Sequence, residues 1–228
     1  MSISSLFCLF LLIFDATYLS SSINQSFYEC NNTTQKCGCS IPSSILFRTT
    51  RILGGERVTV HQSWPWMVSL RRWGHHICGG VLISSFFILT AAHCVPSTGL
   101  AIATGIIQQS NLTANDPRIR AITKVYLHSN FNSTTMLNDL ALLRLEQRIR
   151  HRYLVKICLP AKSDPLPIDS EVIAIGFGHE KQTSIRSSDY LRQVKLRILS
   201  ATSSACKDEL TDPSTQICAG SETANQGS

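Results

Sequence analysis

The chain has 228 residues, of which 43% are hydrophobic, and this is enough to bury one sizeable core or two small ones. Its formal net charge is +6, but the basic residues are scattered, so no run has the density of a nucleic-acid patch and we predict no nucleic-acid partner. The densest basic cluster, which is better explained as a solvated loop than as a recognition face, consists of Arg144, Arg148, Arg150, Arg152 and Lys156.

The N-terminus carries an apolar segment, Leu6 to Phe14, that is too short to span a bilayer. Small polar residues, Ser20 to Ser22, follow it, and this order is typical of a secretory signal peptide. We therefore predict a signal peptide over residues 1–22, no membrane anchor, and a secreted mature protein.

The cysteine content supports the same compartment. One of the nine cysteines, Cys8, lies in the predicted signal peptide, so its removal leaves eight, an even number. This favours disulfide bonds and an oxidising, extracellular route. A secreted glycoprotein would also fit the five Asn-X-Ser/Thr sequons, at Asn24, Asn31, Asn32, Asn111 and Asn132.

Residues 23–51 are rich in Ser, Asn and Thr and cannot form a core of their own. Cys30, Cys37 and Cys39 lie close together within this segment. A zinc site would need four ligands with compatible spacing, and the segment contains no histidine. Disulfide bonding is therefore favoured over metal binding.

The next pattern is strand, turn, strand. Trp66 to Arg71 is mostly apolar, Arg72 to His75 is a polar turn, and Ile77 to Ser84 is apolar again. This order predicts a β-hairpin inside a barrel. Gly79 and Gly80, within the second strand, indicate a bulge or a close approach of backbones.

We predict no metal and no cofactor. A metal site at the adjacent His75 and His76 is less favoured than two exposed loop histidines. Calcium would need acidic ligands, and no acidic cluster lies between Ala103 and Arg120.

The stretch LTAAHC, Leu89 to Cys94, presents a candidate general base. The apolar run Phe86 to Leu89 predicts a buried strand, and two alanines then lead into a tight turn that holds His93 beside Cys94. A rigidly held imidazole suits a general base, which must lie within hydrogen-bond reach of the group it deprotonates. A lone histidine is more often a core or surface residue, so the assignment depends on its partners.

Further short strands follow. Ala101 to Ile107 is apolar, Ile119 to Leu127 alternates, and Leu140 to Leu145 is nearly continuously apolar. Many short strands with almost no helical periodicity predict an antiparallel, all-β sandwich or barrel. Asp139, in NDLALLRL, stands at the head of the last strand, where its carboxylate could orient the imidazole of His93.

The C-terminal third continues this pattern. Val172 to Gly176 predicts a strand, and Gly-Phe-Gly follows at residues 176–178. Val194, Leu196 and Ile198 alternate with basic residues and predict a half-buried strand. Ser200 to Leu210 predicts a short helix, since Ser and Thr can cap its start and Pro213 lies beyond its end.

Three segments together, RILGG at Arg51 to Gly55, LTAAHC and NDLALLRL, resemble the chymotrypsin-like (S1) serine endopeptidases, and in particular a trypsin-like zymogen. The resemblance implies a peptidase domain over residues 52–228, with two antiparallel β-barrels and a cleft between them. The first barrel would span about 52–153 and an incomplete second one about 156–228. It also implies that His93 and Asp139 are catalytic, that substrates are proteins or peptides, that protease inhibitors are partners, and that the protein is a monomer.

The same resemblance implies activation by a trypsin-like protease that cuts between Arg51 and Ile52. The new Ile52 ammonium would fold inward and pair with the aspartate beside the catalytic serine. Residues 23–51 would be a propeptide with a cysteine tether. The implied disulfides are Cys30–Cys37, Cys39–Cys158, Cys78–Cys94 and Cys206–Cys218. The Cys78–Cys94 bond closes a ring of 16 residues, so it would contribute about 3 kcal/mol of stability and hold His93 in place.

The sequence contains no Gly-Asp-Ser-Gly-Gly segment, which would carry the nucleophilic serine. We expect a fragment of a longer, active protease, since a second barrel cut short has unpaired strand edges. The fragment should be inactive by itself, because the nucleophile and the oxyanion hole are missing. A cysteine after Ser228 would put Gly227 where a trypsin-like pocket has its aspartate, which favours apolar or small side chains over Arg and Lys. Two alternatives stay open: a non-catalytic S1-like binding protein, and a short secreted antagonist made by alternative splicing.

Overall fold

The computed structural model describes residues 11–12, 37–38, 55–60, 63–150, 155–160, 167–178 and 187–220, the first pair by its backbone alone. Nearly all regular structure in these residues is β-strand, arranged as one closed barrel and a second sheet. The predicted fold class is thereby confirmed. Among the described residues, no helix is long and apolar enough to cross a membrane.

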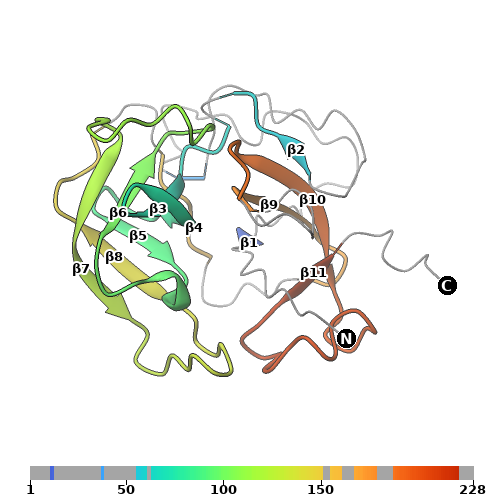
Figure 1. The fold of residues 1–228 in the computed structure, drawn as a ribbon. Helices are drawn as coiled ribbons and strands as arrows, with labels where there is room; N and C mark the ends of the chain where they lie inside the picture. The colour runs from blue at the N-terminus through green and yellow to red at the C-terminus, as the bar shows by residue number, and fades with distance from the viewer. Residues whose placement is uncertain are drawn as a thin grey trace.

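Six antiparallel strands close the barrel, seen at the left of Figure 1, in the order β3–β4–β5–β8–β7–β6. Their order differs from the chain order because β8 inserts between β5 and β7. The strands are β3 (Met67–Arg72), β4 (His75–Leu82), β5 (Phe87–Thr90), β6 (Leu100–Thr104), β7 (Ile119–Leu127) and β8 (Ala141–Leu145). The bounds of all six strands differ from those of the predicted segments by at most a few residues, and β7 has the predicted bounds.

Alternation along the strands fills the barrel. In β8, Ala141, Leu143 and Leu145 are at most 2% exposed, whereas Arg144 between them is exposed. Burying a side chain the size of leucine contributes about 1.5–3 kcal/mol, so these inward positions specify the register of β8. The same core takes in the fully buried Leu70 and Ile88.

The β3–β4 hairpin turns at Trp73 and Gly74, which have φ of 51° and 84°. Both residues are in the left-handed region that a two-residue hairpin turn requires. The predicted close approach at Gly80 is confirmed, because a Cβ there would lie 3.0 Å from Ile88 and 3.1 Å from Val68. The register shift of this pair lies elsewhere, between Leu70 and Arg71.

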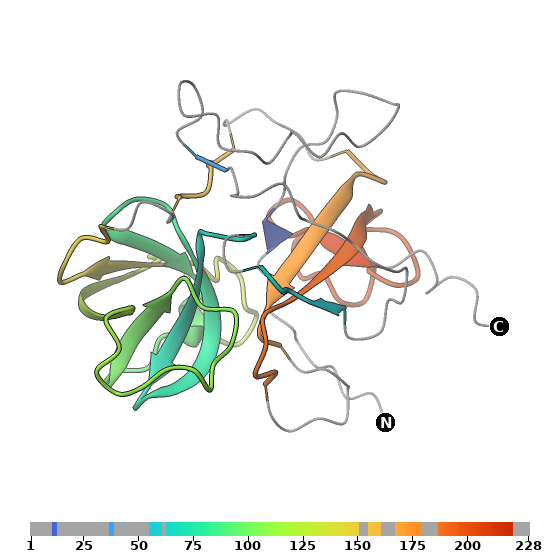
Figure 2. The ribbon, with the colours of Figure 1, turned by 90° about the horizontal axis from the view of Figure 1, so that it is seen from above.

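The second sheet is open and antiparallel, with the order β1–β9–β10–β11 and β2 paired to β10. Figure 2 shows it beside the barrel. Leu11 and Leu12, inside the predicted signal peptide, pair with Ala174 and Ile173 of β9. The bounds are β1 (Leu11–Leu12), β2 (Glu56–Arg57), β9 (Glu171–Gly176), β10 (Arg192–Leu199) and β11 (Cys218–Gly220).

One expectation about the lobes needs correction. Residues 56–57 are predicted to belong to the first lobe, but they pair with Arg192 and Gln193 of the second sheet. A strand of two residues with little apolar content does not specify its own partner, so the free edge available to it decides where it pairs. The half-buried strand predicted around Val194, Leu196 and Ile198 is confirmed as β10. Its buried positions are Gln193 and Ile198, whereas Val194 and Leu196 are half-buried.

The predicted helix from Ser200 to Leu210 is wrong: the segment is a series of turns. Its backbone hydrogen bonds are mostly of the i→i+3 kind, as between Cys206 N–H and Ser203 C=O at 3.0 Å. The Ser200 hydroxyl accepts a hydrogen bond from the Thr202 N–H at 3.3 Å, a local alternative to helical bonding. The Cys206–Cys218 disulfide also ties the segment to β11.

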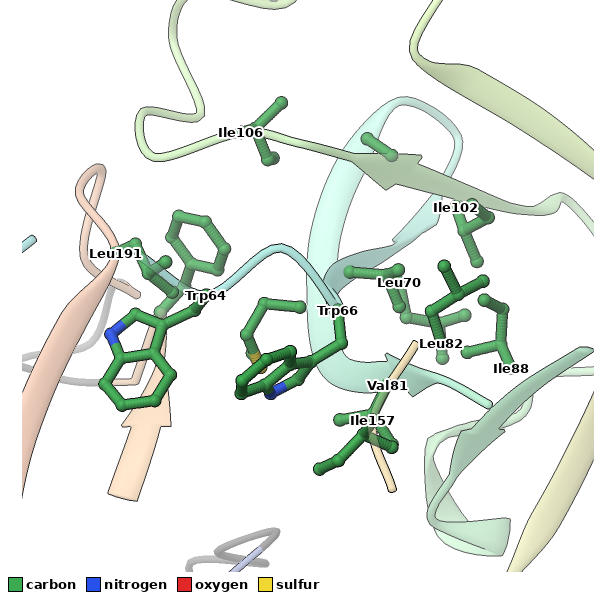
Figure 3. Packing of buried hydrophobic residues seen from close by; sticks show 14 of the residues in the cluster. Trp64, Trp66, Leu70, Val81, Leu82, Ile88, Ile102, Ile106, Ile157 and Leu191 are labelled. Carbon is green, nitrogen blue, oxygen red and sulfur yellow. The ribbon is translucent and has the colours of Figure 1, made fainter. Parts of the chain in front are cut away.

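The barrel and the second sheet share one core. Trp64, 3% exposed, lies on the side of Leu191, which is 1% exposed, and Trp66 continues toward the barrel interior (Figure 3). The two indoles meet edge to face at 5.8 Å. The Leu191 N–H donates to the Ile107 C=O at 2.8 Å, and the Leu191 C=O accepts from the Val58 N–H, also at 2.8 Å. Residues of three chain segments therefore join the two β-structures.

Candidate active site

His93 lies at the C-terminal end of β5, in the one-turn 3-10 helix η2 (Ala92–Cys94). Thr90 and Ala91 are fully buried, so only small side chains fit where the chain leaves the barrel. The Cys94–Cys78 disulfide, with a Cα–Cα distance of 6.0 Å, ties η2 to β4, as predicted. The backbone of His93 is therefore fixed by the barrel, while the residue itself is exposed.

Asp139 precedes β8, at the end of a loop that folds back on itself. Asn138 adopts φ of 54°, a left-handed conformation that asparagine tolerates better than most residues. Its side-chain amide donates to the Asn130 C=O at 3.1 Å, and the Leu140 N–H donates to the Asn138 C=O at 2.7 Å. This turn directs the next side chain, Asp139, toward η2.

The structure brings His93 and Asp139 together, although 46 positions separate them in the chain. The Nδ1 of His93 lies 2.6 Å from Asp139 Oδ2, and the backbone N–H of His93 donates to Oδ1 at 2.9 Å. One carboxylate therefore holds both the ring and the backbone of the histidine. With its proton on Nδ1, the ring presents the lone pair of Nε2 as a base.

The ring of His93 lies close to the Cys78–Cys94 disulfide. The Nε2 atom lies 3.3 Å from Cys94 Sγ, and the possible ligand atoms of Cys78, His93 and Cys94 lie within 4.8 Å of one another. Both sulfurs are bonded to each other, so neither is the thiolate that a zinc site would use. The group of three is a histidine beside a disulfide rather than a set of metal ligands.

The two histidines of the β3–β4 hairpin differ from each other. His75 is exposed, but His76 is half-buried, and its Nδ1 lies 2.8 Å from the hydroxyl of the fully buried Ser69. Burial, and secondarily the charge of Arg71, lower the pKa of His76 from 6.5 to about 4. The expectation of two exposed loop histidines is wrong for His76.

Sequence reasoning missed the polar cluster around His76. Arg71 donates to Gln109 Oε1 and to the Gly74 C=O, and Gln109 also bonds the Ser69 hydroxyl, at 3.3 Å. The His76 ring lies 5.2 Å from the ring of Phe177, so the cluster abuts the second sheet. Its one sequence signal is Ser69, a polar residue in the middle of a buried strand.

The disulfide pairing predicted for the N-terminal segment is wrong. Cys158 bonds to Cys37, with a Cα–Cα distance of 5.0 Å, so it is not available to Cys39, and Cys37 is not available to Cys30. The Gly38 N–H, next to Cys37 in the chain, donates to the Lys156 C=O at 2.9 Å, two residues before Cys158. Cys30 and Cys39 lie outside the described residues. The Cys206–Cys218 bridge is confirmed.

The remaining predicted sites are partly described. Arg51 and Ile52, the activation junction, lie outside the described residues, as do Asn24, Asn31 and Asn32. Of the other two sequons, Asn111 and Asn132 are both exposed. Asn132 Oδ1 accepts hydrogen bonds from the backbone N–H groups of Thr134 and Thr135, at 2.9 and 3.1 Å.

Comparison with known proteins agrees with this geometry. The Trypsin family model matches residues 52–228. Human heparin binding protein is similar in structure, with a TM-score of 0.64 and 25% identity over 75% of this chain and 73% of that chain. An atomic-resolution structure of HBP has a TM-score of 0.65 and 24% identity over 77% of this chain and 75% of its own.

Proposed function

The chain belongs to the trypsin (S1) family, and from this premise we propose that its domain serves serine-type endopeptidase chemistry, with His93 as general base and Asp139 as the carboxylate that orients it. One observation carries the proposal: Asp139 bonds both Nδ1 and the backbone N–H of His93, at 2.6 and 2.9 Å. Such double fixation sets the tautomer and the direction of Nε2 together.

In the proposed reaction a serine Oγ attacks the peptide carbonyl carbon while its proton passes to His93 Nε2. The tetrahedral intermediate collapses, the C–N bond breaks, and the same proton passes to the leaving amine. Water then repeats the sequence on the acyl-enzyme and regenerates the serine. Asp139 stays ionised and stabilises the imidazolium that forms twice in the cycle.

The proposal names no nucleophile among the 228 residues, because they contain no Gly-Asp-Ser-Gly-Gly segment. Serine proteases that lose a triad residue keep some catalysis through the oxyanion hole and substrate binding. The 228 residues lack both the serine and the oxyanion donors, so His93 and Asp139 have no such support. We therefore expect the 228-residue chain to hydrolyse no peptide by itself.

We also propose that the protein is secreted as a zymogen and is cut after Arg51 by a trypsin-like protease. Three disulfides among the described residues favour an oxidising compartment. The Arg51–Ile52 bond lies at the start of the part matched by the family model, which begins at residue 52. Protein or peptide substrates and protease inhibitors would be the partners.

The test compares two products of the same gene. One is the 228-residue chain, and the other is the translation of the whole reading frame, continued past the codon of Ser228 to its stop codon. After cleavage at Arg51, both are assayed with a fluorogenic peptide library. We expect turnover only from the complete product, and its loss in His93→Ala. A reading frame that stops at Ser228, with a folded secreted product, contradicts the proteolytic role.

A second candidate is a non-catalytic binding role, including that of an antagonist. One observation favours it: the protein that resembles this chain at 25% identity is a heparin binding protein. A net charge of +6 is compatible with a polyanionic ligand. Retention of the 228-residue chain on immobilised heparin, against an uncharged matrix, tests this candidate.

A further inference from the structure

We propose that the outer face of the barrel at β7 and β8 binds a sulfated polysaccharide through a strip of four cations, Lys124, Arg144, Arg148 and Arg150. We call these four residues the cationic strip; it revises the expectation of a solvated loop for Arg144, Arg148 and Arg150, since Arg144 lies in the strand β8. The choice of a sulfated ligand rests on the second proposed function, but the strip itself follows from the strand register and from the surroundings of each cation.

The register places two like charges directly opposite each other. Lys124 of β7 pairs with Arg144 of β8, and both residues are exposed. Directly opposed residues on one face have Cβ atoms about 4.5–5.5 Å apart, and like charges in that position destabilise a sheet. A pairing of this kind costs the free protein stability, and an anion bound between the two cations would reverse the sign of that interaction.

A β-bulge creates this opposition. The β7–β8 register shifts between Ile122 and Lys124, and Thr123, left over in the bulge, donates its hydroxyl to the Arg144 C=O at 3.2 Å. The bulge turns Lys124 outward beside Arg144, which is itself directed outward by the buried Leu143 and Leu145 on either side. The Lys124 ammonium lies 4.8 Å from the centre of the Tyr126 ring, over the same outer face.

Arg148 and Arg150 extend the strip beyond the end of β8. Both are exposed and flank Ile149, which is buried and donates its N–H to the Ser85 C=O at 2.9 Å. Ser85 lies just before β5, whose first residue, Phe87, pairs with Arg144. Because Ile149 is anchored at this edge, its two neighbours project from the surface next to Arg144.

The four cations are not neutralised within the described part of the chain. The ion pairs there join His93 with Asp139, Arg118 with Asp116 and Arg197 with Glu171, and none involves the strip. Glu146 is the one carboxylate between Arg144 and Arg150, so this stretch and Lys124 together carry four positive charges and one negative charge. Arg guanidinium groups suit sulfate, because they offer paired donors in a planar fork.

The strip is separate from the candidate active site. Figures 1 and 2 place β7 and β8 on the side of the barrel that lies away from the second sheet. Asp139 precedes β8 and Arg144 lies five residues further on, roughly 17 Å at about 3.4 Å per residue. A polysaccharide on the strip would therefore leave His93 accessible.

The test is affinity for heparin as a function of salt, measured on the whole 228-residue chain. Lys124→Gln, Arg144→Gln, Arg148→Gln and Arg150→Gln are compared with Lys207→Gln, which removes one exposed cation from the turns after β10. Each strip variant should weaken binding about 3- to 10-fold at physiological salt and lower the salt slope by about one, whereas Lys207→Gln should change neither. Lys124→Arg, which keeps the charge, should bind like the wild type.

Folding is controlled by thermal melting in the absence of heparin. Lys124→Gln and Arg144→Gln should melt at or above the wild-type temperature, because each removes a like-charge pair. If Lys207→Gln lost as much heparin affinity as the strip variants, the strip would not be the binding site, although the protein would still bind polyanions. Absence of any heparin binding would overturn the second proposed function, and tighter binding to double-stranded DNA than to heparin would overturn the sulfated ligand.

Discussion

The indole N–H of Trp64 donates a hydrogen bond of 2.7 Å to the side-chain carbonyl of Gln193, a residue 129 positions further along the chain. Both side chains are buried, at 3% and 5% exposed. The amide nitrogen of Gln193 in turn donates to Glu56 Oε1 at 2.9 Å. Gln193 thus links the entry to the barrel, the strand β2 and the second sheet through one side chain.

Gln193→Leu should destabilise the protein by about 1–3 kcal/mol, since it removes the acceptor of a buried donor. Gln193→Glu keeps an acceptor but brings a second carboxylate to Glu56, so it should also destabilise. The measurement is urea unfolding of the whole chain. In a double-mutant cycle, Trp64→Phe should cost less in the Gln193→Leu background than in the wild type, and additive costs would contradict the link.

The hydrogen bond between Trp64 and Gln193 could not be predicted from the sequence, although other features could. β7 was predictable because Ile119 to Leu127 alternates, and His93 and Asp139 because each follows or precedes an apolar strand. Gln193 was not predictable, because a glutamine in a strand reads as solvent-facing unless its partner, here Trp64, is known. The choice of Cys37 over Cys39 as the partner of Cys158 was not predictable either, because the two cysteines lie two positions apart and the sequence does not distinguish them.

Other misses have local physical causes. Ser200 to Leu210 has a helical pattern on paper, but its Ser and Thr side chains bond the nearby backbone and a disulfide fixes Cys206. The opposition of Lys124 and Arg144 depends on a bulge, and a one-residue shift in pairing does not show in the pattern of either strand. The sequence predicts which strands exist better than it predicts what lies opposite each residue.

Gly99→Ala should destabilise the β3–β4 hairpin. Gly99 has φ of 75°, and a Cβ there would lie 2.6 Å from the ring of Trp73, whose own φ is 51°. A loss of about 1–3 kcal/mol is expected from the left-handed backbone and the overlap together. Trp73→Gly in the Gly99→Ala background should recover the part due to overlap, as measured by thermal melting. No recovery would mean that backbone conformation alone sets the cost.

Stability should fall as the pH is lowered from about 6.5 to about 4. The pKa of His76 is lowered to about 4 in the folded protein, so in this window the unfolded chain binds a proton that the folded protein does not. The stabilisation by neutral His76 is therefore complete above pH 6.5 and is lost on the way to pH 4, on the order of 2–3 kcal/mol in all. His76→Gln should flatten this dependence in urea unfolding.

The neighbouring His75 offers a matched control for that experiment. It is exposed at the turn and lies next to His76 in the chain, so His75→Gln removes a histidine from the same hairpin without touching the Ser69 contact. Its pH profile should follow the wild type. Equal flattening by the two variants would contradict the assignment to His76.

Asp139→Asn should leave the fold intact and reverse the proton arrangement of His93. An amide in place of Oδ2 can donate to Nδ1, which would move the ring proton to Nε2 and remove the base. Nitrogen-15 NMR of the histidine ring in the 228-residue chain reports the tautomer directly. In the complete product, the fall in kcat should be about 10⁴-fold, the loss known for this change in serine proteases.

Asp208→Asn is the control for that change, because Asp208 is an exposed carboxylate in the turns after β10. It should alter neither the tautomer nor kcat. If Asp139→Asn left Nδ1 protonated, the carboxylate would not be what orients the ring, and the role proposed for Asp139 would be wrong.

The Cys37–Cys158 bond predicts how the N-terminal segment behaves after activation. Cys37 precedes Arg51 and Cys158 follows it, so cleavage at Arg51 should leave the segment attached to the domain. On a gel, cleaved protein should release the segment only when it is reduced. Cys37→Ser should release it without reduction, whereas Cys39→Ser should not, since Cys39 is not the partner of Cys158. The opposite result for the two variants would restore the Cys39–Cys158 pairing and contradict the Cys37–Cys158 bond.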